Sequence, residues 1–281
     1  MFNKTISEKI NKKVLIDGVD KKTIPHAQLF FGPNGAGKLN TALAYIQYIL
    51  CENKKQHDSC GECSNCQKNQ LLIHPDVHFI FPVTSGPKIT KPISSDYLDL
   101  WKEMILNSTK IDLENWRKTI SKSNKKLSIY VHESWNIERI ISLKSYQGDY
   151  KIFLIWHAEK LNTAASNKLL KSLEEPPPQT IFILISEKKD LLIRTILSRV
   201  ISLKFNLINI KEKDSLLVNP KTNDKNEKLL NWFVDWMRLC FQAKKMNRID
   251  ELIMFTEGIS NLNRSEQIDF LNFTTEHFRK T

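Results

Sequence analysis

One short glycine-rich segment, residues 32–38, constrains the fold of this chain more than any other feature: it reads Gly-Pro-Asn-Gly-Ala-Gly-Lys. In loops of this spelling, glycines let backbone N–H groups face a phosphate, and the lysine reaches the terminal phosphates. The residues in these positions are Gly32, Gly35, Gly37 and Lys38. A Ser or Thr that holds Mg²⁺ should follow, but the next residue is Leu39. The sequence therefore predicts a degenerate phosphate loop, which keeps the shape of an ATP site without its metal ligand.

The segments around this loop predict the strand and the helix that it needs. Residues 29–31 are an apolar run that leads into the loop, and residues 39–50 continue with apolar side chains at helical spacing. Further runs with the apolar character of buried strands lie at 77–83, 151–156, 180–186 and 200–205. Helical segments separate these runs, so the pattern predicts an α/β fold with a parallel sheet.

The long connection between residues 83 and 151 contains no residues of catalytic character. We expect a helix at 97–107 and a strand at 128–132 within it. Its tryptophans are Trp101, Trp116 and Trp135. They lack the alternation with basic residues that a base-stacking platform would show, so we interpret them as core or interface residues.

Four of the five cysteines lie within sixteen residues, in the pattern C-x8-C-x2-C-x2-C. They are Cys51, Cys60, Cys63 and Cys66. Four thiolates at this spacing favour structural Zn²⁺ in tetrahedral coordination, with no position left for a catalytic water. An iron–sulfur cluster is the alternative, but in the ferredoxin spacing the fourth cysteine lies downstream and precedes proline. We therefore expect residues 51–66 to form a zinc-binding insert.

ATP hydrolysis by a phosphate-loop enzyme also needs an acidic residue near the end of a core strand, to support Mg²⁺. The run 151–156 ends in Trp156, His157 follows it, and the first carboxylate is Glu159. With Leu39 in the other metal position, both supports for Mg²⁺ are absent. We expect no intrinsic ATPase activity and no firm binding of ATP.

The length of 281 residues allows two domains. We place the first at residues 1–206, including the insert. We expect residues 207–281 to be an α-helical region, because an apolar stripe at 229–241 and a last apolar pattern from about residue 263 both have helical spacing.

The net charge of +11 is spread along the chain, so we interpret it as a solvated surface rather than as a specific DNA site. No stretch approaches the roughly 20 apolar residues that a membrane span needs, and residues 1–11 lack the apolar core of a signal peptide. We expect a globular cytoplasmic protein without a membrane partner.

Two later motifs complete the pattern: residues 169–177 read Leu-Leu-Lys-Ser-Leu-Glu-Glu-Pro-Pro, and residues 197–199 read Leu-Ser-Arg. The order of phosphate loop, four-cysteine insert and these two motifs resembles the delta-prime subunit family of bacterial DNA polymerase III clamp loaders, over about residues 22–206. Shorter segments, at residues 24–28, 149–151 and 235–238, are similar to delta-prime chains of the Bacteroidetes type.

This resemblance implies an AAA+ protein, with a RecA-like α/β domain, a small helical lid and a helical collar that joins a five-subunit ring. It implies a stator that does not hydrolyse ATP and that works with the motor subunits and the delta subunit to load the sliding clamp onto primed DNA. The Ser-Arg motif, here Ser198 and Arg199, implies that Arg199 is an arginine finger on ATP bound by a neighbouring motor subunit. Since only about 75 residues follow Asn206, the lid is expected to be shortened or the collar partial.

Two other functions stay open at this point. The first is an ATP-driven motor that uses the loop at 32–38, against which Leu39, Trp156 and His157 argue. The second is a zinc-bearing nucleic-acid-binding module, which the charge and the cysteines favour. That module would bind primed DNA with a steep salt dependence.

Overall fold

The computed structural model describes residues 9–85, 89–108, 111–120, 126–207, 223–246, 249–262 and 264–278. The chain divides into two compact units, Met1–Lys213 and Asp214–Thr281. Among the described residues, no helix combines the length and the apolar character that crossing a lipid bilayer requires.

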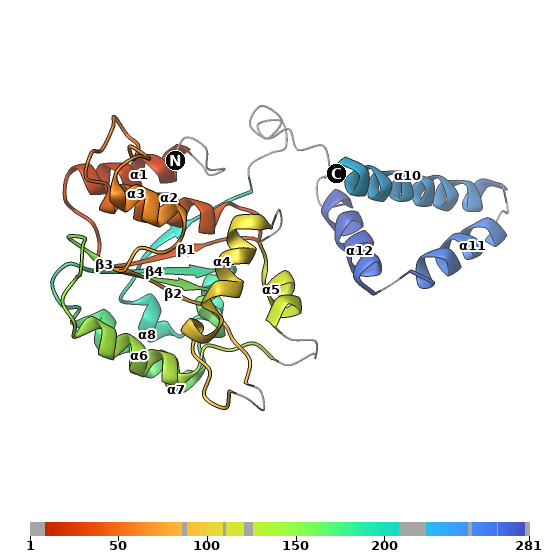
Figure 1. Ribbon diagram of the computed structural model, residues 1–281. Coiled ribbons are helices and arrows are strands. Elements are labelled where there is room, and N and C mark those ends of the chain that lie inside the picture. The colour runs from red at the N-terminus through yellow and green to blue at the C-terminus, as the bar shows by residue number, and fades with distance from the viewer. Residues whose placement is uncertain are drawn as a thin grey trace. The chain divides into compact units, whose positions relative to one another are not determined.

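The first unit is built on a five-stranded parallel sheet (Figure 1). Its strands are β1 (Ala27–Phe31), β2 (Val77–Ile80), β3 (Lys151–Trp156), β4 (Thr180–Ser186) and β5 (Ile201–Lys204), in the spatial order β2-β3-β4-β1-β5. Phe31 pairs with both Ser186 and Lys204, and Trp156 pairs with Ile185. The carboxyl ends of four strands therefore meet at one edge of the sheet. The predicted α/β class and parallel sheet are confirmed.

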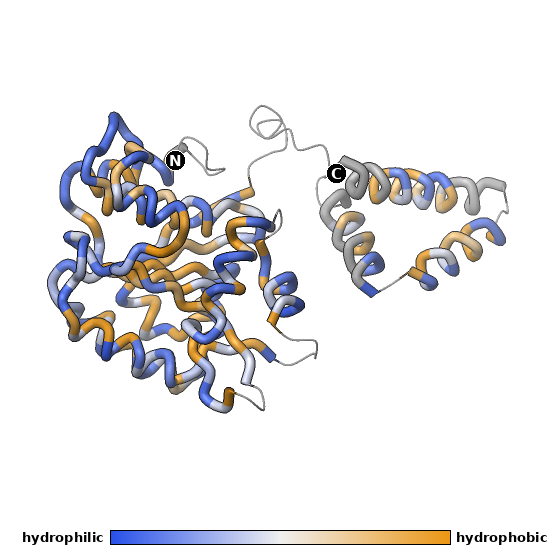
Figure 2. The backbone as a smooth tube through the Cα atoms, viewed as in Figure 1, coloured by the Kyte–Doolittle hydropathy of each residue, from blue (hydrophilic) through white to orange (hydrophobic). Residues whose placement is uncertain are grey.

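Helices cover both faces of this sheet (Figure 1). One layer holds α1 (Lys9–Asp20), α2 (Lys38–Leu50), α4 (Leu98–Asn107) and α5 (Leu113–Ile120); the other holds α6 (Val131–Ile141), α7 (Thr163–Glu174) and α8 (Arg194–Leu197). Successive strand side chains point to opposite faces, so Phe30 packs into the first layer's core and Leu29 into the second. Burial on both faces explains why the central strands β3 and β4 are largely apolar, as the orange strands of Figure 2 show.

The edge strand β2 is shorter than predicted. The apolar run continues to Val83, but the strand ends at Ile80. Pro82 follows and has no backbone N–H to offer to a ladder. Val83 instead makes an isolated antiparallel bridge to Ser128.

The strand predicted at 128–132 is wrong. Ser128 and Ile129 each form one isolated bridge, and helix α6 begins at Val131. Helical packing prevails over the short β-like run, because Ile137 of α6 is fully buried in the second core.

Two of the three tryptophans are core residues, as predicted. Trp101 and Trp116 are completely buried, and the Trp101 ring stacks on Phe81 with ring centroids 5.0 Å apart. Trp135 is 52% exposed, so it is not a core residue, and an interface role for it stays a prediction. It lies on α6 beside His132, with ring centroids 5.2 Å apart.

The second unit is helical in its described residues. Its helices are α10 (Asn223–Met246), α11 (Ile249–Ser260) and α12 (Arg264–Phe278). Trp232 and Trp236, one turn apart on α10, both contact Phe270 of α12 at ring-centroid distances of 6.2 Å. The stripe at 229–241 thus lies on a helix, as predicted. Residues 208–222 and 263 lie outside the described residues.

His78 gives the first unit a pH-dependent contact. Its ring packs against Phe153 with centroids 5.0 Å apart, and burial, followed by the charge of Lys151, lowers its pKa to about 4. An unfolded chain binds this proton near pH 6.5. The contribution of neutral His78 to stability is therefore present above about pH 6.5 and is lost as the pH falls towards 4.

We expect His78→Phe to flatten the dependence of the free energy of unfolding on pH between about 6.5 and 4. Urea unfolding at a series of pH values measures this slope. The parent, unfolded over the same pH series, is the reference for this slope. An unchanged slope in His78→Phe would contradict the assignment.

Candidate functional site

The phosphate-type loop joins β1 to α2, and its glycines make this connection possible. Gly32 has φ +149°, and a Cβ atom there would lie 2.0 Å from the carbonyl oxygen of Phe205. Gly37, with φ 75°, is the left-handed residue that precedes the first turn of α2. A larger residue at either position would strain the backbone or collide with the chain after β5.

Lys38 is bound by its own loop. Its Nζ donates to the carbonyl oxygens of Gly32, at 2.6 Å, and of Pro33, at 2.7 Å. Burial lowers the pKa of this ammonium group, against the opposing charges of Glu187 and Glu159. Two loop carbonyl oxygens therefore accept hydrogen bonds from the ammonium group that would otherwise face phosphate oxygens.

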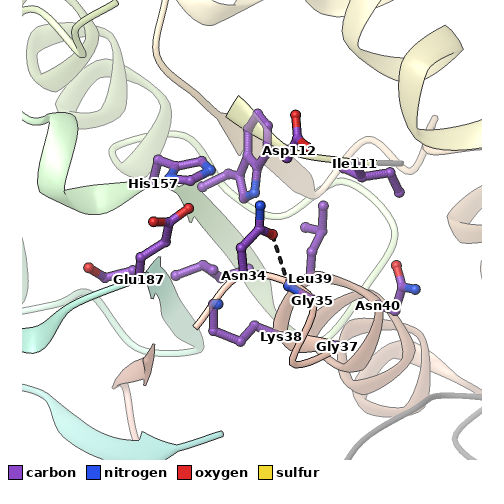
Figure 3. A pocket seen from close by; sticks show the side chains of 13 residues that line it. Asn34, Gly35, Gly37, Lys38, Leu39, Asn40, Ile111, Asp112, His157 and Glu187 are labelled. Atoms are coloured by element: carbon purple, nitrogen blue, oxygen red, sulfur yellow. Dashed lines mark hydrogen bonds between the residues drawn. The ribbon is translucent and has the colours of Figure 1, made fainter. Parts of the chain in front are cut away.

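A cavity of about 380 Å³ lies over the loop, at the ends of β3 and β4 (Figure 3). Leu39 lines it and is 8% exposed, so an apolar side chain occupies the position where Mg²⁺ would need a hydroxyl. In Figure 3, Asp112 and His157 lie across the cavity from the loop, and Glu187 lies beside Asn34.

A buried histidine–carboxylate contact follows β3. His157 has a left-handed backbone, with φ 54°, and its Nδ1 lies 2.8 Å from Oε1 of Glu159. The two side chains are 7% and 5% exposed. Burial alone would raise the pKa of Glu159, but the hydrogen bond and charge interaction with His157 outweigh it and lower the pKa. The first carboxylate after β3, that of Glu159, is thus hydrogen-bonded to His157.

Sequence reasoning missed Asp112 and Glu187. Glu187 directly follows β4, so the rule that parallel sheets place their sites at the carboxyl ends of strands could have found it. Asp112 comes from the connection before α5, where its Oδ1 accepts the N–H of Asn115 at 2.7 Å. No local pattern predicts that this connection reaches the cavity.

Among the described residues that line the cavity, one ammonium group faces two carboxylates. The single ammonium of Lys38 stands with the carboxylates of Asp112 and Glu187, which line the cavity, and of Glu159, which acts on Lys38 by charge. A nucleoside triphosphate would add negative charge here without a hydroxyl to help hold Mg²⁺.

The four cysteines predicted as metal ligands come together between α2 and β2. Cys51 follows α2, Cys63 precedes α3 (Ser64–Gln70) and Cys66 lies within it. All four Sγ atoms, including that of Cys60, lie within 4.8 Å of one another.

The spacing of these sulfur atoms fits tetrahedral coordination. The Sγ atom of Cys60 is 3.6 Å from that of Cys51 and 3.8 Å from that of Cys66. Four sulfurs at about 2.3 Å from one Zn²⁺ would be roughly 3.8 Å apart. The N–H groups of Glu62 and Cys63 donate to Cys60 Sγ, and these bonds lower the pKa of the Cys60 thiol to about 6 against the effect of burial. The cluster can therefore hold a metal ion.

Arg199 lies in the turn between α8 and β5, apart from the residues that line the cavity. Its side chain is 31% exposed and forms an ion pair with Glu174, the last residue of α7. Its Nη1 also donates to the carbonyl oxygen of Thr195 at 2.7 Å. The motifs at 169–177 and 197–199 are therefore in contact through the ion pair between Glu174 and the partly exposed guanidinium of Arg199.

Comparison with known proteins identifies relatives for most of the chain. A family model described as DNA polymerase III, delta subunit, matches residues 7–209. The chain is 28% identical over 239 residues to DNA polymerase III subunit delta′ of Bacillus subtilis, across 85% of this chain and 59% of that protein. It is 28% identical over 174 residues to the subunit of the same name from Escherichia coli, across 62% of this chain and 40% of that protein.

The chain thus spans about half the length of these curated relatives. A solved gamma subunit-related protein from Thermotoga maritima aligns with 95% of this chain and 78% of its own, at 14% identity and a TM-score of 0.43, which is too low to support an argument. Because the family model matches well over half of the residues, the chain belongs to the DNA polymerase III delta-subunit family and is similar to its delta-prime members.

Proposed function

We propose that this chain is a non-catalytic, delta-prime-like stator of the DNA polymerase III clamp loader, which helps to load the sliding clamp onto primed DNA. The observation that carries the proposal is the family match over residues 7–209. Its partners would be the motor subunits and the delta subunit. Further relatives named tau and gamma subunits support a place in this complex. We propose the cytoplasm as its location.

The phosphate loop has a structural role in this proposal. The ammonium group of Lys38 donates hydrogen bonds to two loop carbonyl oxygens, and Leu39 is a buried apolar residue that lines the cavity. The loop then holds β1 and α2 in position, and ATP binding is not required. This argument favours a stator over the alternative of an ATP-hydrolysing motor.

The remaining site residues have separate roles in the proposal. Arg199 acts in trans, as a finger on ATP bound by a neighbouring motor subunit. Cys51, Cys60, Cys63 and Cys66 hold structural Zn²⁺, which the distances between their sulfur atoms suit.

Reconstitution with the presumed motor subunits tests the function. The chain alone is expected to hydrolyse no ATP, and its addition is expected to raise the DNA- and clamp-stimulated ATP hydrolysis of the motor subunits. A Lys38→Ala variant of this chain should support the same rate as the parent, since Lys38 contacts only its own loop in this role. Turnover by the isolated chain that Lys38→Ala abolishes would favour the motor instead. Failure to assemble with the motor subunits would contradict the stator.

A further inference from the structure

Arg199 is fixed by contacts from two neighbouring helices of the first unit, α7 and α8. Its Nη1 donates to the carbonyl oxygen of Thr195 at 2.7 Å and to Oγ of Ser198 at 3.0 Å. Its Nη2 pairs with Oε1 of Glu174. These contacts use three of the five N–H donors of a guanidinium. The arginine can therefore be held by its own domain and still donate to a further anion.

Glu174 occupies a well-anchored position. It ends α7, since the next residue, Glu175, closes the helix with an N–H bond to the carbonyl of Lys171 at 3.2 Å. The preceding Leu173 is fully buried, and its carbonyl oxygen lies 3.1 Å from Nε2 of His26, directly before β1. The backbone next to Glu174 is thus fixed to the central sheet by the burial of Leu173 and by its contact with His26.

We propose that Glu174 is a positioning residue for Arg199, which sets the direction in which the guanidinium meets a phosphate of the neighbouring subunit. The inference rests on the proposed function of Arg199. Arginine has a long side chain with many rotamers, so ordering it only in the transition state would cost conformational entropy. A guanidinium ordered beforehand avoids this cost.

The opposite role for Glu174 would be a restraint, in which its carboxylate masks the arginine. Two observations favour positioning. The Arg199 side chain stays 31% exposed beside Glu174, so the carboxylate does not cover it. Thr195 and Ser198 accept hydrogen bonds from the other terminal nitrogen, Nη1, through contacts that do not neutralise the charge of the guanidinium. Because removal of a positioning group lowers the rate and removal of a restraint raises it, the two roles predict changes of opposite sign.

The test measures ATP hydrolysis by the complex reconstituted with whole-chain variants. Glu174→Ala is expected to lower the chain-dependent kcat about tenfold, with an unchanged KM for ATP, because misplacing a catalytic group acts on the transition state. Glu174→Gln keeps an oxygen acceptor and is expected to retain most of the rate. Glu175→Ala removes the same charge from the next residue, and this control should equal the parent.

Each other outcome overturns the positioning role. Equal kcat for Glu174→Ala and Glu175→Ala, together with a lowered kcat for Arg199→Ala, would show that Arg199 acts as a finger and that Glu174 does not position it. A higher kcat for Glu174→Ala would indicate a restraint. If Arg199→Ala has no effect, the finger fails and the positioning role fails with it. Melting temperatures and assembly, measured for every variant, separate these results from misfolding.

Discussion

If this chain is the proposed stator, replacing Arg199 by alanine is expected to abolish the increase in ATP hydrolysis by the motor subunits that the parent chain gives in the reconstituted complex, while the complex still assembles. A guanidinium supplied in trans stabilises the charge that develops on the transferring phosphoryl group, and known fingers contribute about 10³ to 10⁵ in rate. Under the proposed function, the loss should appear in kcat at the ATP site of the motor subunit that Arg199 would contact. Steady-state hydrolysis with primed DNA and clamp, together with gel filtration of the complex, measures both parts.

The matched control for this prediction is Arg194→Ala. Arg194 begins α8, five residues before Arg199, and is exposed, so it carries the same charge in the same short segment, and the ion pair with Glu174 is made by Arg199. This variant should support the parent's rate. Equal losses in the two variants would show that the surface needs positive charge in general, and the finger would be rejected.

Arg199→Lys sharpens the same test. Lysine keeps one positive charge, but its ammonium group cannot donate to Thr195, Ser198 and Glu174 with the fork geometry of a guanidinium and still reach a phosphate. The lysine variant is therefore expected to resemble the alanine variant. Full ATP hydrolysis with the Arg199→Lys variant would indicate that a positive charge is sufficient at this position and that the geometry of the guanidinium is not needed.

The central sheet was predictable from sequence because parallel strands are buried on both faces. β3 and β4 have the bounds that their apolar runs predicted, and both are buried along their whole length. The prediction failed at the edge of the sheet. At Ser128 and Ile129 a short apolar run could not be told from the start of a helix, since packing of later residues on α6 decided the outcome.

Some residues of the candidate sites were likewise predictable from the sequence, and others were not. The loop glycines and the four cysteines are close in sequence, so spacing alone revealed them. Asp112 and Glu187 reach the cavity from separate connections, and only the folded chain brings them into the same cavity as Lys38. The pair of Glu174 and Arg199 likewise joins two motifs that were recognised separately. Chemistry that depends on contacts between distant segments has no local signal.

Cys63→Ser is expected to lose bound zinc and to lower the melting temperature of the chain. Removing one of four thiolates weakens a site that the folded chain alone assembles, so binding energy that supports folding is lost. A loss of about 2 kcal/mol would lower the melting temperature by roughly 4–8 °C in a domain of this size. Elemental analysis of the purified protein gives the identity and amount of the metal, and calorimetry gives the melting temperature.

The fifth cysteine provides the control for the zinc site. Cys240 lies on α10 in the second unit, outside the cluster of four, so Cys240→Ser removes one thiol and should keep the parent's zinc content. Chelation of the parent should lower its melting temperature as far as Cys63→Ser does, because both remove the same cross-link between the end of α2 and α3. Equal zinc content in Cys63→Ser and the parent would refute the ligand assignment. Iron in place of zinc would identify the cluster as an iron–sulfur site.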